Sequence, residues 1–124
     1  MDKVQILSLR SRLGIPQETF ARILRTNYAT VSRWETGKAR PTELQAELLT
    51  MVEGLIENTD YDVKKVKDLL IGFGVIGTLG LITGMIPPAS IGVFGPIGWL
   101  VGEGVATGKK LRRLLAKSPR PRPS

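Results

Sequence analysis

Residues 12–41 constrain the fold most, because their pattern specifies two short helices separated by a tight turn. Pro16 suits the first turn of the first helix, since the backbone N–H that proline lacks would be unpaired there. We expect Gln17 at the start of this helix and a turn over 25–27 at its end. Three residues give the helix an apolar stripe: Phe20, Ala21 and Leu24.

A second short helix is predicted over residues 28–35. Asn27 can cap its N-terminus, because an asparagine side chain accepts a hydrogen bond from the first-turn amides. Gly37 can supply the left-handed residue that ends it. Val31 and Trp34 are expected to face inward. The candidates for the outward face are Tyr28, Ala29, Thr30, Ser32 and Arg33.

Two further helices are predicted to flank this pair. Residues 2–13 carry apolar residues at roughly helical spacing before Gly14, with Arg10 and Arg12 on the outside: Val4, Ile6, Leu7, Leu9 and Leu13. Thr42 and Gln45 have capping-box spacing. The helix that they open has apolar positions at Leu44, Leu48, Leu49, Val52, Leu55 and Ile56. Four or five short helices around one small core are therefore expected in residues 1–58.

The charge is unevenly distributed. Residues 1–60 hold eight Lys/Arg and eight Asp/Glu, so the whole net charge of +7 comes from residues 61–124, with ten basic and three acidic groups. Residues 1–40 have eight basic and three acidic groups, whereas residues 41–60 have five acidic groups and no basic one. One end of the first domain is thus predicted to be basic, as a phosphate-facing surface should be. An ordinary solvated charge distribution is the alternative.

The composition excludes several kinds of chemistry. The chain has no Cys and no His, and it has no group of carboxylates at metal or acid/base spacing. Disulfides, thiolate catalysis, Cys-based zinc sites and the usual general base are therefore absent. We expect no enzymatic activity, no metal and no cofactor. The N-terminus lacks the apolar core of a signal peptide, so we expect it to be cytoplasmic.

Residues 9–49 resemble the lambda-repressor/Cro-like (XRE-type) helix-turn-helix family of bacterial and phage regulators. The matching residues are Arg10, Leu13, Gly14, Gln17, Ala21, Leu24, Val31, Ser32, Arg33, Trp34, Glu35, Gly37 and Pro41. The resemblance implies a five-helix domain whose third helix reads the major groove of double-stranded DNA, usually as a dimer on a palindrome. The chain departs from the family at Pro16, where a capping Ser or Thr is usual, and at Arg25, where the turn usually has a small residue.

The resemblance also implies a set of DNA-binding residues. Gln17 would contact a phosphate, and five residues would lie at the groove: Asn27, Tyr28, Ala29, Ser32 and Arg33. Arg33 can form a bidentate contact with guanine, although a solvated or salt-bridged role is the alternative. Tyr28 either contacts DNA or covers the turn. Trp34 is expected to pack in the core, and Glu35 to act as a structural cap or salt-bridge partner.

The second half of the chain is apolar and rich in glycine. No charged residue occurs for 34 positions over residues 69–102, and basic residues flank this run on both sides. A membrane-spanning helix needs about 20 predominantly apolar residues. Residues 69–86 supply eighteen without a charge, and residues 89–107 supply nineteen that include Pro96 and Glu103. Two short spans that turn at Pro87 and Pro88 are therefore expected.

The sequence predicts an all-α chain. A helix-turn-helix domain over 1–58 is followed by a linker over 59–68, a glycine-rich apolar helical hairpin over 69–108 and a basic, Pro-rich tail over 109–124. Basic flanks place both ends of the hairpin in the cytoplasm if it inserts into the inner membrane. Glycines four residues apart, as at 80 and 84, let helices approach closely in lipid. The alternative is a soluble oligomerisation element buried between subunits.

Two functions from different classes fit these features. The first is a sequence-specific DNA-binding protein, a transcriptional regulator and homo-oligomer, attached to membrane lipid through the hairpin. The second is a membrane-inserting or self-assembling effector, in which the helix-turn-helix is autoregulatory or contacts other proteins. The letters GFGVIG at 72–77 match a dinucleotide fingerprint, but no strand precedes them and no acidic residue follows, so nucleotide binding is discounted.

Overall fold

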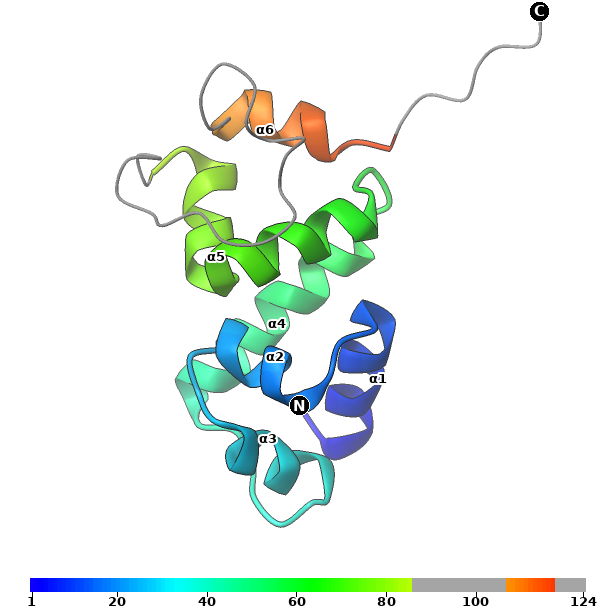
Figure 1. Ribbon diagram of the computed structural model, residues 1–124, viewed down its shortest axis with the longest axis vertical. Helices are drawn as coiled ribbons and strands as arrows, with labels where there is room; N and C mark the ends of the chain where they lie inside the picture. The colour runs from blue at the N-terminus through cyan, green and yellow to red at the C-terminus, as the bar shows by residue number, and fades with distance from the viewer. Residues whose placement is uncertain (86–106, 118–124) are drawn as a thin grey trace, which may run out of the picture.

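The computed structural model describes residues 1–85 and 107–117, and this part of the chain is all-α, as predicted. Its helices are α1 (Lys3–Leu13), α2 (Gln17–Ile23), α3 (Tyr28–Glu35), α4 (Glu43–Glu57), α5 (Val63–Thr83) and α6 (Gly108–Leu115). Figure 1 shows α1, α2 and α3 at one end of the molecule and α6 at the other. Helix α4 runs between the two ends, and α5 lies across its far end.

Most of the predicted ends of the N-terminal helices are confirmed. The Asn27 side chain caps α3, because its Oδ1 accepts from the Thr30 amide at 2.9 Å. Thr42 and Gln45 form the expected capping box at the start of α4. Pro16 differs by one position, since it is the residue before α2 and adds no side-chain cap. Glycines with positive φ follow α1 and α3, as predicted: Gly14 at 66° and Gly37 at 77°.

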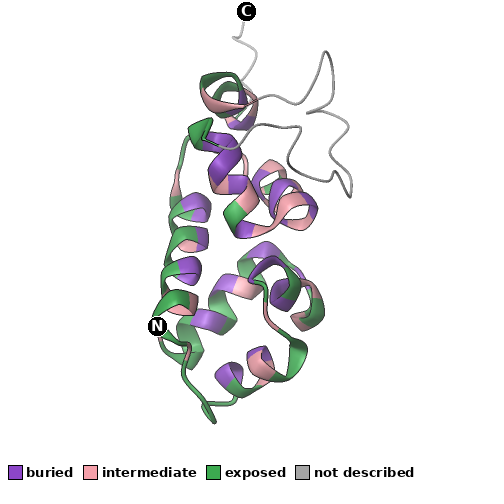
Figure 2. Ribbon diagram, turned by 90° about the vertical axis from the view of Figure 1, so that its left-hand side faces the viewer, coloured by how far each residue is buried: buried purple, intermediate pink, exposed green. Residues whose placement is uncertain are grey.

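One apolar core runs through all six helices. Trp34 and Phe20 are among its largest buried side chains, so the expected packing role of Trp34 is confirmed. Figure 2 shows the buried residues on the inward sides of the helices and the exposed residues on their outer sides. Helix α5 contributes Val66, Leu69 and Leu70 to the same core as α1 to α4. The first half of α5 is therefore part of the fold of the N-terminal helices.

Three residues expected on the apolar stripes are exposed instead. Val4 and Leu44 are each 65% exposed, and Leu7 is 37% exposed. A helix presents one face to a core, and the α1 face is filled by residues that follow i, i+3 and i+7: Ile6, Leu9 and Leu13. The sequence therefore assigned more apolar residues to the inward faces of these helices than the core can cover.

Helix α5 begins earlier than the sequence suggested. Residues 63–68 are helical rather than linker, because the Asp62 side chain accepts from the Lys64 amide at 3.0 Å and Val66 packs in the core. The connection between α4 and α5 is therefore limited to residues 58–62. It is short enough to hold α5 against α4.

A kink at Gly74 divides α5. The backbone there has φ 74° and ψ 178°, which is outside the helical region and open mainly to glycine. A Cβ atom at this position would lie 3.3 Å from the carbonyl oxygen of Ile23, so the backbones of α5 and α2 approach closely. The first limb of the predicted hairpin is thus a bent helix packed on the N-terminal domain. The turn at Pro87 and Pro88 and the second limb lie outside the described residues.

The end of α5 meets the start of α6. Gly84 has φ 75° and ends α5, so it does not lie on a helix face with Gly80 as the spacing suggested. A Cβ atom on Gly84 would lie 3.6 Å from the Cα atom of Gly108. Residues 108–115 are helical rather than part of a tail, because Leu111 and Leu115 are fully buried against α5.

A candidate nucleic-acid interface

The outward side of α3 carries the residues predicted to lie at a groove. Asn27, Tyr28, Ala29 and Arg33 are exposed, and Ser32 is half-buried. Positions 28, 29, 32 and 33 are spaced i, i+1, i+4 and i+5, so they share one side of the helix. The opposite side is anchored in the core by Val31 and Trp34. The structure therefore brings five of the six predicted residues together on one surface.

The sixth predicted residue, Gln17, lies at the start of α2 and contacts the end of α3. Its Nε2 donates a hydrogen bond of 2.9 Å to Oε1 of Glu35. The amide thereby ties the N-terminus of α2 to α3. An amide nitrogen carries two N–H groups, so the second can donate to another acceptor.

Glu35 is the centre of a partly buried polar network. Arg10 donates to both of its oxygens, from Nε at 2.7 Å and from Nη2 at 2.9 Å. A third Arg10 nitrogen, Nη1, donates to the Ile15 carbonyl at 3.0 Å. The Glu35 side chain is only 4% exposed. The hydrogen bond to Glu35 raises the pKa of Arg10, burial opposes this, and the nearby negative charge adds to the increase.

This network fixes the helices that present the candidate interface. It joins the last turn of α1, the loop before α2, the start of α2 and the end of α3. The predicted structural role of Glu35 is confirmed. The sequence placed Arg10 on the outside of the first helix and did not pair it with Glu35, because 25 residues separate the two.

The turn between α2 and α3 falls where it was predicted. Arg25 adopts φ 58°, the left-handed conformation for which glycine is usual. The Thr26 amide donates to the Ala21 carbonyl at 2.9 Å and closes the turn. The departure from a small residue at position 25 therefore leaves the turn intact, at a cost of about 1–2 kcal/mol in backbone strain.

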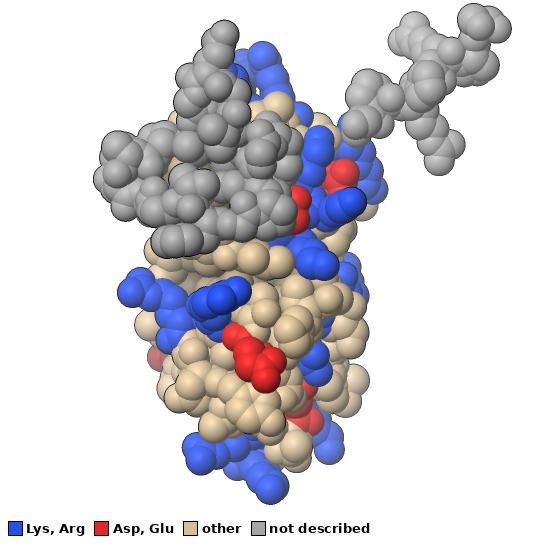
Figure 3. Space-filling view, viewed as in Figure 1, with Lys and Arg blue, Asp and Glu red and all other residues tan. Residues whose placement is uncertain are grey.

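The surface around α3 is basic. Five exposed cations lie on α2, the turn, α3 and the loop that follows: Arg22, Arg25, Arg33, Lys38 and Arg40. Over residues 15–42, Glu18 is exposed, while Glu35 is paired with Arg10. Figure 3 shows Lys and Arg side chains at the end of the molecule formed by α3 and its following loop. Such a surface attracts polyanions.

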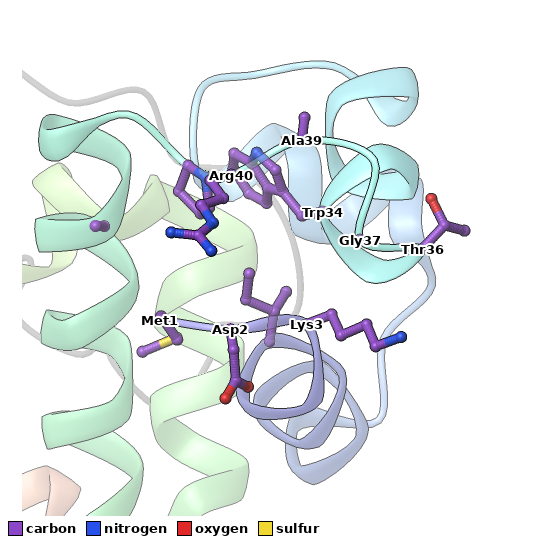
Figure 4. Close-up of a pocket in the computed structure, with 11 residues that line it drawn as sticks. Met1, Asp2, Lys3, Trp34, Thr36, Gly37, Ala39 and Arg40 are labelled. Atoms are coloured by element: carbon purple, nitrogen blue, oxygen red, sulfur yellow. The ribbon is translucent and has the colours of Figure 1, made fainter.

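A groove of about 590 Å³ lies beside this surface, between the start of α1 and the loop after α3. Figure 4 shows Trp34 and Arg40 on one side of it and Met1, Asp2 and Lys3 on the other. Two cations, Lys3 and Arg40, therefore border the groove. The described residues contain no group of three His, Cys, Asp or Glu side chains able to hold a metal ion.

Comparison of the chain with protein-family models, curated proteins and solved structures gives no match.

Proposed function

We propose that this protein is a sequence-specific DNA-binding protein, a transcriptional regulator that reads the major groove with α3. The observation that carries the proposal is the outward face of α3, which combines exposed polar and small residues with a rigid support behind it. The major groove admits an α-helix and presents a distinct donor and acceptor pattern for each base pair. The basic residues around α3 would meet the phosphates on either side.

The residues have distinct roles in this proposal. Arg33 meets the O6 and N7 atoms of a guanine, and Ala29 can contact a thymine methyl group. Tyr28 and Ser32 supply hydroxyl groups on the same face. Asn27 uses its side-chain oxygen to cap α3, which leaves its NH₂ group as the donor toward DNA. Gln17 donates its second N–H to a phosphate and thereby sets the register of α2 on the backbone.

The proposal extends to a homodimer on a palindromic site, the arrangement usual for proteins of the helix-turn-helix type. Two copies would place their α3 helices in successive major grooves, about 34–36 Å apart. The mass of the protein–DNA complex on a selected palindrome tests this, since two chains should bind one duplex. A complex of one chain with one half-site contradicts it.

The test of base reading compares Arg33→Ala with Gln17→Ala in the full chain, on a selected operator and its single-base variants at fixed salt. Arg33→Ala should cost roughly 1–3 kcal/mol on the operator and relax the preference at one base position. Gln17→Ala should weaken binding about equally across sequences, because a phosphate contact carries little sequence information.

Arg12→Ala is the matched control for charge, since Arg12 lies on α1 and pairs with Glu57 and is not among the residues proposed to contact DNA. It should change the affinity little. If neither Arg33→Ala nor Gln17→Ala alters binding, α3 is not the reading helix. Failure to retard any DNA would favour the effector function, in which the N-terminal domain contacts proteins.

A second candidate function is attachment to the inner membrane, with the DNA-binding domain in the cytoplasm. Its support is α5, whose 21 residues and mean hydropathy of 1.6 over its most apolar stretch suffice in length and composition to cross a membrane. Half of that stretch is buried inside the protein, as in a core helix, so insertion requires α5 to leave its packing on α2 and α4.

Fractionation of cells that express the full chain tests this attachment. An inserted protein sediments with membranes and resists washing with high salt, because apolar burial in lipid is insensitive to charge screening. A full chain that is monodisperse without detergent contradicts insertion. It would leave α5 as the core helix that packs on α2 and α4.

A further inference from the structure

The outer face of α6 is a concentrated cationic surface at the end of the molecule remote from α3. Its four exposed cations, the α6 cationic face, are Lys109, Lys110, Arg112 and Arg113, and the exposed Lys117 follows two residues after the helix. No acidic residue occurs over residues 107–117. Figure 1 shows α6 and α3 at opposite ends, so a ligand on one does not obstruct the other.

Buried leucines and backbone contacts hold α6 in a fixed orientation. Leu111 and Leu115 are fully buried against α5. Arg112 Nη1 donates to the Ile82 carbonyl at 3.0 Å, and the Asp62 amide donates to the Leu115 carbonyl at 2.7 Å. Lys65 Nζ also donates, to the Leu114 carbonyl at 2.8 Å. The cations are therefore presented outward by a packed helix and not by a loose tail.

Two of the charges are unfavourable for the helix that carries them, whereas Arg112 and Arg113 lie in its last turn, where the dipole favours cations. Lys109 and Lys110 lie in the first turn, where the helix dipole disfavours cations, and the Thr107 side chain provides no cap. Lys109 and Arg113 are four residues apart, a spacing at which like charges repel. An anionic partner would relieve both conflicts.

An exposed apolar side chain lies near the N-terminal end of α6. Met85 is 82% exposed, the largest exposure among the large apolar residues of the described chain. It follows Gly84, whose backbone touches that of Gly108 at the start of α6. Cations beside an apolar group match the interface of a lipid bilayer, which offers anionic headgroups above an apolar layer. Phosphates of a nucleic acid offer only the charge.

We propose that the α6 cationic face and Met85 dock on the surface of a bilayer that contains anionic phospholipid. The inference goes beyond the proposed function, because it assigns an anionic lipid surface to α6 and does not require α5 to insert. Each Lys or Arg near an anionic membrane surface contributes about fivefold to binding. A protein held in this way would present α3 to DNA on the side away from the membrane.

The test is cosedimentation of the full chain with vesicles of phosphatidylcholine alone or with about a third phosphatidylglycerol, at physiological salt. The triple variant Lys109→Gln, Lys110→Gln, Arg113→Gln removes three exposed charges and leaves the Arg112 contact intact. It should lower binding to anionic vesicles about 100-fold. The matched control, Lys3→Gln, Lys38→Gln, Arg40→Gln, removes the same charge near α3 and should leave vesicle binding unchanged.

The unsubstituted chain should bind anionic vesicles, leave neutral ones in the supernatant, and be released at about 1 M salt, where the Debye length falls to about 3 Å. Met85→Gln should weaken vesicle binding without altering operator affinity. Equal binding to neutral and anionic vesicles would overturn the proposal and favour insertion of α5. A triple variant that loses DNA affinity but keeps vesicle binding would overturn it in favour of a second nucleic-acid surface.

Discussion

Different kinds of contact hold the helices together within the N-terminal region (α1 to α4) and within the C-terminal region (α5 and α6). In the N-terminal region, hydrogen bonds between side chains link Arg10, Gln17 and Glu35 and fix three helices. In the C-terminal region, the backbones of Gly84 and Gly108 approach closely, and Lys65 and Arg112 donate to carbonyl groups of the facing helix. The close approach at Gly74 joins α5 to α2 of the N-terminal region.

The difference shows how each region obtains a unique arrangement. Charged side chains with several donors accept few geometries, so the N-terminal network can hold a small exposed helix in a fixed orientation. Helices α5 and α6 are joined by hydrogen bonds from Lys65 and Arg112 to backbone carbonyl groups. Their arrangement also depends on close packing and on positions that favour glycine. The two regions nevertheless share one apolar core, through the first half of α5.

The largest expected effect comes from breaking this shared core. Leu69→Ala should destabilise the whole protein by about 2–5 kcal/mol, because Leu69 is fully buried between the regions. Leu44→Ala is the control, since Leu44 is 65% exposed and its loss should cost less than about 0.5 kcal/mol. Urea unfolding of both variants measures this. Equal midpoints would mean that α5 does not support the N-terminal helices.

The next effect should come from the polar network. Arg10→Ala leaves the buried Glu35 carboxylate without its cationic partner, with only the Gln17 amide still donating to it, and should cost about 2–3 kcal/mol. Arg12→Ala removes the same group from an exposed pair with 3.6 Å separation and should cost no more than about 0.5 kcal/mol. Thermal unfolding compares the two. Similar melting temperatures would show that the network does not fix the N-terminal region.

The sign of the pH dependence follows from the raised pKa of Arg10. A cation whose pKa is raised by folding stabilises the protein fully below its unfolded pKa and loses this contribution only as pH rises through the folded value. Both values lie in strong alkali, so the difference between Arg10→Ala and the unsubstituted protein should not depend on Arg10 ionisation near neutral pH.

Glycine substitutions test whether backbone conformation matters more in the C-terminal region than in the N-terminal region. Gly74→Ala should destabilise by about 1–2 kcal/mol, because alanine is strained at φ 74° and its Cβ would press on the Ile23 carbonyl at 3.3 Å. Gly54→Ala should stabilise by up to about 1 kcal/mol, because Gly54 is helical and open space surrounds it. In chemical unfolding, the change in the free energy of unfolding should therefore have opposite signs for the two variants. Stabilisation by Gly74→Ala would mean that α5 is straight at this point.

The smallest effect concerns Thr78. Its hydroxyl is fully buried and has no hydrogen-bond partner in the described part of the chain, and its residue at i−4 is the non-helical Gly74. Thr78→Val should stabilise by about 1 kcal/mol, since it removes an unpaired buried polar group. Thr50→Val should give no gain, because the Thr50 hydroxyl already donates to the Ala46 carbonyl at 2.9 Å. Calorimetry can resolve this difference.

Local signals in the sequence were sufficient for the helix boundaries of the N-terminal region. Asn27, Thr42 and Gly37 act within one helical turn of their own position, so their residue type and spacing predict the ends of α3 and α4. The outward side of α3 follows in the same way from Val31 and Trp34 on its inner side. The helix α6 was missed, because its two buried leucines stand among cations that suggested a solvated tail.

The sequence by itself determined where the N-terminal helices begin and end and which side of α3 is polar, because caps and periodicity act over a few residues. Only the tertiary structure decided that Arg10 pairs with Glu35, since the two meet through the packing of α1 on α3. It also decided where α5 lies. An apolar helix gains similar free energy in lipid, between subunits or on its own domain, so composition cannot choose among them. The backbone contact between Gly74 and Ile23 places it on its own domain.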